Sequence, residues 1–353
     1  MAYTTIDKPS DHFDTKLYTG TSGAINITGL DFQPDWVWCK NRASGNRHAV
    51  FDSVRGVTKR IRTDGTDVEV ADPDTLTSFN SDGFTVGADA EAYGVNANND
   101  AFVSWNWKAG TSFTNDASST SVGSVDTAGS VNTTAGFSIM KYTGVSGQQT
   151  IAHGLGAVPR MIIVKNLDSA ETWRVYHHFN TADKYMKLNT TNAVVDDNGS
   201  FSGVTPTSSV ITMGGDDGTM HANEEMIAYI FAEKQGYSKF GNYTGNGNAN
   251  GAFVYTGFKP AWIMFKNTVN GGHWQIYDTT RNTFNVVDDH LKANANSATI
   301  ADDADESIDI VSNGFKCRGT SNNNNNHSGN VYIFMAFAKE PFVTSKGIPA
   351  TAR

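Results

Sequence analysis

The segment "PDWVWCKN" at residues 34–41 decides the fold, because it returns as "PRMIIVKN" at 159–166 and "PAWIMFKN" at 260–267. Each copy begins with proline, continues as a largely apolar run and ends in Lys–Asn. Alternate residues of a strand point to opposite faces. A run that is apolar on both faces therefore predicts a central strand that is covered on both sides. Proline suits the first residue of such a strand, where no ladder donor is required.

A second anchor precedes each copy at nearly constant spacing. The segments "YTGTSG" (18–23), "YTGVSG" (142–147) and "YTGNGN" (243–248) place their tyrosine 16 or 17 residues before the proline. Each unit closes on an apolar run, "AFVSWNW", "MIAYIFA" or "VYIFMAFA". The period of about a hundred residues is far above the 20–50 residues of solenoids. The sequence therefore predicts three repeated domains, each with its own core.

The composition indicates that these domains are built from strands. Gly, Asn, Thr and Ser are abundant, Asp–Gly and Asn–Gly pairs separate short apolar runs, and no stretch has the pattern of a three-turn amphipathic helix. We expect an all-β fold of three tandem antiparallel β-sandwich modules that resemble jelly rolls. The predicted order is an N-terminal arm (1–10), module 1 (11–110), a Ser/Thr/Gly linker (111–134), module 2 (135–236), module 3 (237–341) and a C-terminal arm (342–353).

Charge and hydropathy exclude several classes of partner. The net charge is −9 and no long basic stripe occurs, so no nucleic-acid partner is expected. The N-terminus has no apolar core typical of a signal peptide, and no apolar run is long enough to span a bilayer. We expect a soluble protein without membrane insertion. Cys39 and Cys317 are expected to be free thiols, as in a protein folded in a reducing cytoplasm.

Sequence motifs for catalysis are missing. The chain has no HExxH, CxxC, GxSxG or Walker pattern, so we predict no catalytic residue and no cofactor. Acid clusters such as "DDADE" (302–306) suit solvated loops, and Ca²⁺ is the alternative because carboxylate oxygens are its preferred ligands. Two of these carboxylates could also serve a polysaccharide depolymerase. The motifs "FDSVRG" (51–56) and "YDTTRN" (277–282) predict local Asp–Arg ion pairs at a turn.

Two tryptophans occupy matching positions near predicted loop tips. Trp173 and Trp274 stand two residues before Val175 and Ile276 of their predicted strands. They are interpreted either as the rim of a sandwich core or as exposed platforms for a glycan or a protein partner.

The two arms lie outside the repeat register and cannot bury a core alone, so each would fray unless it is tied down. We expect at least one arm to dock on a neighbouring subunit or partner by adding main-chain hydrogen bonds to a sheet edge. The C-terminal arm is the better candidate because it carries apolar anchors and a cationic end: Phe342, Val343, Ile348 and Arg353.

Several long segments resemble a known family. The stretches "AYTTIDKPSDHFDTKLYTG", "QPDWVWCKNR", "SIMKYTGVSGQQTIAHGLGAVPRMIIVKN" and "MAFAKEPFVTSKGIPATAR" are similar to marine bacteriophage, often cyanophage, virion structural or tail-fibre-like proteins. The resemblance covers nearly all of the chain except the Ser/Thr-rich linker, and the third module departs most. It implies a non-enzymatic protein exposed on the virion, as a tail fibre or receptor-binding element or as a capsid or tail decoration. The implied partners are other virion proteins, further copies of the chain and a host surface glycan. A carbohydrate-binding module or a tail depolymerase remains the alternative.

Overall fold

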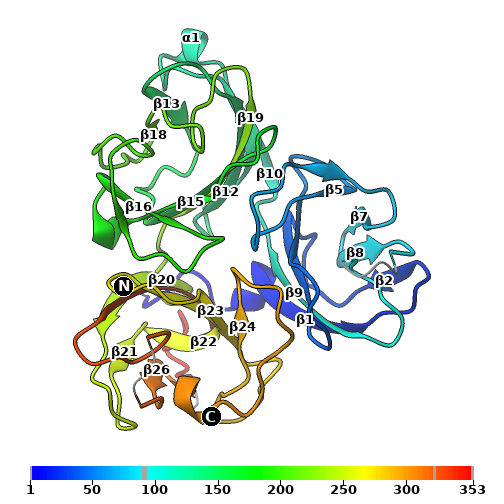
Figure 1. Ribbon diagram of the computed structural model, residues 1–353, viewed down its shortest axis with the longest axis vertical. Helices are drawn as coiled ribbons and strands as arrows, with labels where there is room; N and C mark the ends of the chain where they lie inside the picture. Colours follow the sequence, from blue (N-terminus) through cyan, green and yellow to red (C-terminus); the bar gives the residue numbers. More distant parts are fainter. Residues whose placement is uncertain (1, 90–93, 321–322, 351–353) are drawn as a thin grey trace.

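Three main β-sheets with equivalent strand orders form three lobes around a common centre (Figure 1). The computed structural model describes residues 2–89, 94–320 and 323–350. Every pair of named strands is antiparallel, and the few helices are short (η1, Pro9–Asp11; α1, Ala117–Thr120; η2, His178–Asn180; η3, Ala304–Glu306). The predicted all-β antiparallel fold is therefore confirmed.

The first lobe, blue in Figure 1, has two layers. Its main sheet has the order β1 (Phe13–Thr19), β9 (Ala101–Trp107), β3 (Trp36–Asn41), β4 (Ala49–Asp52). Its small sheet has the order β2 (Ile25–Ile27), β8 (Gly83–Val86), β7 (Leu76–Asn80), and β5 (Lys59–Arg60) pairs with β6 (Val70–Ala71). Val37 and Phe51 of the main sheet pack with Leu76 and Phe84 of the small sheet in one buried core.

The main sheet of the second lobe, green, has the same order of four strands and continues with further strands at both edges. The equivalent strands are β12 (Phe137–Thr143), β19 (Glu225–Phe231), β14 (Met161–Asn166) and β15 (Arg174–His177), followed by β16 (Lys184–Lys187) and β17 (Val195–Asp196). A small sheet of β13 (Gln149–Ala152) and β18 (Val210–Met213) accompanies them. On the other side, β11 (Thr127–Asn132) and β10 (Thr111–Asn115) continue the main sheet from β12.

The prediction of a separate linker over 111–134 was wrong, because this segment supplies β10 and β11. Its hydroxyl-rich composition is typical of linkers, but its backbone pairs with the edge of β12, and Val125 and Val131 enter the core of the second lobe. Main-chain pairing of this kind leaves little trace in composition.

The third lobe, yellow to orange, repeats the first. Its main sheet has the order β20 (Ser238–Thr244), β27 (Val331–Pro341), β22 (Phe258–Asn267), β23 (Gln275–Asp278), β24 (Leu291–Lys292), and its small sheet β21 (Phe253–Tyr255), β26 (Gly314–Cys317), β25 (Ile308–Val311). Lys40, Lys165 and Lys266 are the penultimate residues of β3, β14 and β22, each of which pairs with the closing strand of its lobe. The predicted equivalence of these three segments is confirmed.

In each lobe one face of the main sheet packs on the small sheet, and the opposite face is turned toward the other lobes. These three opposite faces meet in one shared core. Trp36 of the first lobe stacks on Tyr229 of the second with ring centroids 4.6 Å apart, and Trp107 contacts Trp262 of the third lobe edge-on at 5.6 Å. Each central strand is thus covered on both sides, as its sequence predicts. The cover on one side comes from the other lobes, so the lobes do not bury their surfaces independently.

The Tyr–Thr–Gly repeat packs against the loop that precedes the last main-sheet strand of each lobe (β9, β19 and β27). Each tyrosine hydroxyl donates to a carbonyl of that loop: Tyr18 to Val95 (2.8 Å), Tyr142 to Thr219 (2.7 Å) and Tyr243 to Asn325 (2.8 Å). A Cβ on the glycine would lie 2.0 Å from the Ala97 oxygen at Gly20, 2.0 Å from the His221 oxygen at Gly144 and 2.4 Å from the His327 oxygen at Gly245. Glycine is required for this close backbone approach.

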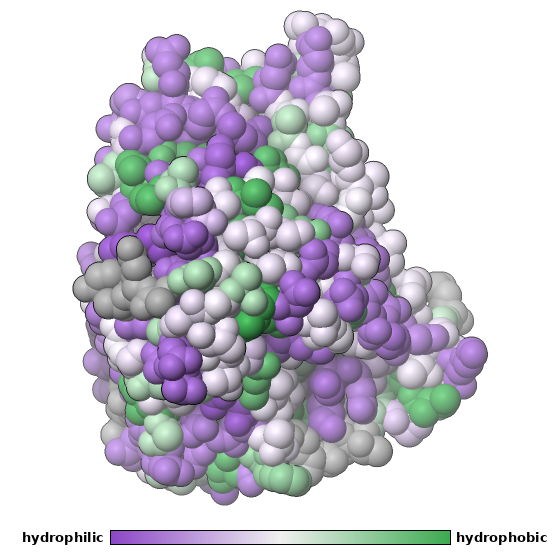
Figure 2. Space-filling model, turned by 90° about the vertical axis from the view of Figure 1, so that its right-hand side faces the viewer, coloured by the Kyte–Doolittle hydropathy of each residue, from purple (hydrophilic) through white to green (hydrophobic). Residues whose placement is uncertain are grey.

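The surface is polar, with small scattered apolar patches on the face drawn in Figure 2. Cys39 and Cys317 are buried free thiols, as predicted. Among the residues that the structure describes, no helix is long and apolar enough to cross a membrane.

Candidate functional site

The repeated polar residues gather at the joints between lobes, where they form a cyclic set of contacts. The first set consists of ring N–H groups that donate to a backbone carbonyl of the preceding lobe: Trp173 Nε1 to Arg62 O (2.8 Å), Trp274 Nε1 to Lys187 O (3.0 Å) and His48 Nε2 to Lys292 O (3.0 Å). The third contact joins the first lobe to the last and closes the ring.

Trp173 and Trp274 are completely buried at these joints. The interpretation as exposed platforms for a glycan or partner was therefore wrong, because the neighbouring lobe covers both rings. Sequence reasoning missed His48, which stands at the matching position three residues before Phe51. A comparison of the three repeats by position rather than by residue type would have found it.

The three lysines of the repeat are buried beside the same joints. Lys266 Nζ donates to Thr191 O of the second lobe (3.2 Å) and Lys40 Nζ approaches Asn296 O of the third (3.4 Å). Burial lowers the pKa of Lys40 and Lys165 to about 8, and that of Lys266 to about 7. Backbone carbonyls thus hold three ammonium groups that burial disfavours.

The predicted Asp–Arg pairs form, and they are fully buried rather than exposed. Arg55 Nε lies 2.5 Å from Asp52 Oδ2, and Arg281 Nε lies 2.6 Å from Asp278 Oδ2. The same carboxylates also accept hydrogen bonds from the next lobe in the ring.

The donors from the next lobe are an aromatic hydroxyl and an indole. Tyr229 donates its hydroxyl to Asp52 (2.7 Å), and Trp105 donates Nε1–H to Asp278 (3.0 Å). Burial, together with the Asp52 charge, raises the pKa of Tyr229 well above its usual range. In the second lobe His177 takes the place of the aspartate and donates Nε2–H to Phe334 O (3.3 Å). Burial lowers the pKa of His177 to about 3, so this imidazole is neutral.

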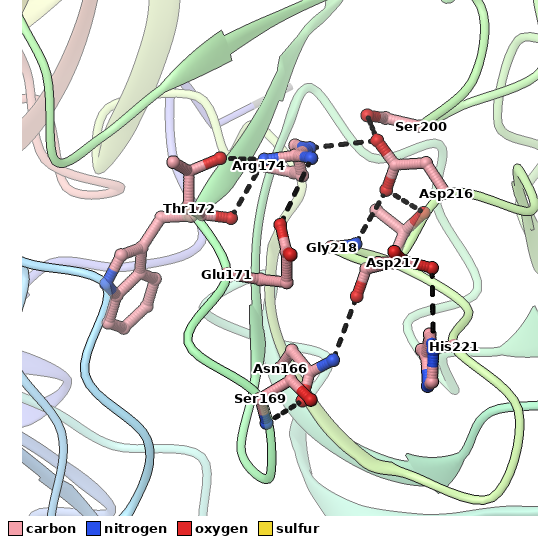
Figure 3. A network of polar contacts seen from close by, with 12 residues as sticks. Asn166, Ser169, Glu171, Thr172, Arg174, Ser200, Asp216, Asp217, Gly218 and His221 are labelled. Atoms are coloured by element: carbon pink, nitrogen blue, oxygen red, sulfur yellow. Dashed lines mark hydrogen bonds and ion pairs between the residues drawn. The ribbon is translucent and has the colours of Figure 1, made fainter.

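The second lobe carries a network of polar side chains around Arg174 (Figure 3). Arg174 Nε lies 2.9 Å from Asp216 Oδ2, and its Nη2 lies 3.7 Å from Glu171. Ser200 Oγ and the Gly218 N–H donate to the two oxygens of Asp216. The Asp216 carboxylate is thus occupied by partners within its own lobe, which speaks against its use as a free catalytic acid.

Near the matching place in the third lobe lies a cluster of one imidazole and two carboxylates. His290, Asp303 and Glu306 each offer a ligand atom, and these atoms all lie within 4.8 Å of one another. His290 Nε2 lies 2.9 Å from Glu306 Oε2, and Gln275 donates Nε2–H to the same oxygen (2.6 Å). Two of these residues belong to the segment "DDADE", for which the sequence predicts either solvated acids or Ca²⁺.

The terminal arms are bound to the chain itself. Ile6, within the expected N-terminal arm, is buried in the shared core. Tyr3 contacts Phe342 edge-on with centroids 6.2 Å apart, and Asp7 accepts from the Ser345 N–H (2.6 Å). The arms are thus tied down within the chain, by each other and by contacts such as the hydrogen bond from the Tyr3 hydroxyl to Gly257 O (2.7 Å).

Of the four residues named for docking, Phe342 and Val343 are partly buried in the chain's own C-terminal turn, while Ile348 is 62% exposed. Arg353 lies outside the described residues. Docking of this arm on another molecule stays a prediction.

These features define an all-β protein of three repeated lobes closed into a ring. The chain belongs to the family described as domain of unknown function DUF7483, which matches it over residues 8–341. No curated protein and no solved structure matches the chain.

Proposed function

We propose that the protein is a non-enzymatic structural component of a phage particle, exposed on the tail or capsid. The observation that carries the proposal is where the repeated polar residues lie. Asp52, Asp278, Trp173 and Trp274 join one lobe to the next instead of lining a cleft. A chain built in this way is a rigid block for assembly. The resemblance of its sequence to virion proteins agrees with that role.

The direct test is the protein content of purified particles of the phage that encodes the chain. We expect mass spectrometry to find it in a fixed copy number per particle, and gold-labelled antibodies to place it at one position on the tail or capsid. Absence from particles, with abundant protein in the infected lysate, would refute the proposal. Release of reducing ends from host envelope polysaccharide by the purified protein would favour the depolymerase instead.

We propose Ile348 as an anchor on a virion partner or a second copy, because it is the apolar residue of the C-terminal arm that stays exposed. The variant Ile348→Asp should fold normally and lose incorporation into particles. Val269→Asp is the matched control, since Val269 is an exposed valine (52%) of a third-lobe loop. Equal incorporation of both variants would show that the arm does not anchor the protein.

A second candidate role is contact with a host surface glycan, and it rests on one surface. Phe253 and Tyr255 of β21 are each 53% exposed and flank a hollow of about 570 Å³ between β21 and β20. Exposed aromatic rings are suited to stack on sugars. Tyr255→Ala should then weaken binding to host polysaccharide, while Phe284→Ala, a change at another exposed aromatic, should not. Equal binding by both variants would contradict this role.

A further inference from the structure

In each lobe a partly or fully buried carboxylate near the edge of the main sheet has a basic or polar partner, and the type of partner differs from lobe to lobe. In the first lobe Arg60 Nη1 lies 3.0 Å from Asp72, and in the second Arg174 lies 2.9 Å from Asp216. The repeat register places His290 where the first lobe has Arg60, and Gln275 where the second lobe has Arg174. Both arginines are thus replaced in the third lobe, yet Glu306 and Asp303 are present.

His290 is the second and independent sign of a ligand. Its side chain is completely buried, and its Nδ1 has no hydrogen-bond partner among the described residues. Its Nε2 lies 2.9 Å from Glu306 Oε2. Two neighbouring ligands of a tetrahedral ion at about 2.1 Å lie about 3.4 Å apart, so a small separation of the imidazole from the carboxylate would admit the ion.

We propose that His290, Asp303 and Glu306 bind one divalent transition-metal ion of the Zn²⁺ type. An imidazole together with carboxylates suits Zn²⁺ and related ions. Ca²⁺ takes oxygen ligands, so the nitrogen donor argues for the transition-metal class. Asp303 is only partly buried and forms the solvent-facing side of the cluster, with its ligand oxygen within 4.8 Å of the ligand atoms of His290 and Glu306.

The position of the cluster gives the ion a structural task. The segment between His290 and Asp303 forms the joint that closes the ring onto the first lobe. Lys292 O accepts from His48, Ala293 O accepts from Thr63 Oγ1 (2.7 Å) and the Thr299 N–H donates to Arg42 O (3.0 Å). An ion held by residues at both ends of this segment would fix the loop and thereby the closure of the ring.

The test uses the full chain after removal of metal by a chelator and dialysis. Titration calorimetry with Zn²⁺ should show one ion per chain, and melting should shift to higher temperature in a saturable way, because a ligand that binds the native state stabilises it. Bound Zn²⁺ should also protect the segment 293–303 from proteolysis. Ca²⁺ should bind at least tenfold more weakly, and tighter Ca²⁺ binding would overturn the assignment of the metal class.

Two variants separate a metal site from a buried ion pair. Asp303→Asn removes one ligand on the open side and should lower Zn²⁺ affinity by about tenfold or more. Asp302→Asn makes the same change of charge one residue away at an exposed position, and should leave affinity unchanged. Full-strength Zn²⁺ binding by a folded Asp303→Asn variant would overturn the site. Absence of Zn²⁺ binding by the unmodified chain would show that His290 and Glu306 form an ion pair only.

Discussion

Lys266 gives the sharpest test of how the lobes are joined, because its ammonium group is buried at a joint, where it donates to backbone carbonyls. Its Nζ donates to Asn267 O (3.0 Å) and Thr191 O (3.2 Å). Burial lowers its pKa from 10.5 to about 7. Between these two values the unfolded chain holds a proton that the native chain has released. Stability should therefore rise with pH across this range.

The size of the effect follows from the two pKa values of Lys266, which are about 7 in the folded chain and 10.5 in the unfolded chain. Between pH 7 and pH 9 the lysine should add about 2 kcal/mol to the free energy of unfolding, since each unit of pH contributes up to about 1.4 kcal/mol per proton released. Below pH 7 both states are protonated, and the cost of burying the charge is fully present. Lys266→Met keeps the length of the side chain and removes the titration.

The measurement is chemical denaturation of both proteins at several pH values from 6 to 9.5. The stability of Lys266→Met relative to the unmodified chain should be greatest at the acid end and should decline by about 2 kcal/mol by pH 9. Lys346→Met, at an exposed lysine of the C-terminal arm, is the control and should leave the pH dependence intact. Parallel curves for Lys266→Met and the unmodified chain would refute the reasoning. The remaining rise in stability should come from Lys40 and Lys165, whose pKa values are also lowered by burial, and the raised pKa of the two buried thiols should oppose it above about pH 9.

Three further outcomes are expected. Trp274→Phe should lower the free energy of unfolding by about 1–3 kcal/mol, because Lys187 O loses its indole donor inside a joint, and denaturant unfolding will measure the loss. Asp278→Asn should cost about 3–5 kcal/mol by leaving the Arg281 cation buried without its carboxylate, whereas a double variant that also carries Arg281→Met should recover part of that loss. Both cysteines should resist a thiol reagent at pH 8 in the native protein and react fully in denaturant, because burial raises the pKa of each to about 12; fast native labelling would contradict their burial.

Sequence reasoning succeeded where the signal is local to one strand. The apolar runs before Lys40, Lys165 and Lys266 are short, continuous and bounded by proline and Lys–Asn, so their existence as buried strands and their equivalence could be predicted. The Asp–Arg pairs were predictable for the same reason, since both partners lie within four residues. Their complete burial was not, because the groups that cover them come from a different lobe.

The failures share one physical cause, which is that packing between lobes joins segments far apart in the chain. Trp173 is a loop residue by its neighbours in sequence, yet its partner Arg62 is 111 residues away. The segment 111–134 reads as a linker because strand pairing at a sheet edge needs only backbone groups. The cluster of His290 with Asp303 and Glu306 was equally hidden, since a histidine just before a strand and acids in a later loop have no fixed spacing that marks a metal site.

The cyclic arrangement makes the third joint differ from the other two in the length of chain that it closes. The first two joints pair residues 111 and 87 positions apart. The joint between His48 and Lys292 pairs residues 244 positions apart, and because closure entropy grows with the logarithm of the separation it costs about 0.7–0.9 kcal/mol more. That joint is also the one beside the proposed metal cluster and near the segment that accepts the buried Lys40. An ion bound there would therefore stabilise the joint that closes the longest stretch of chain.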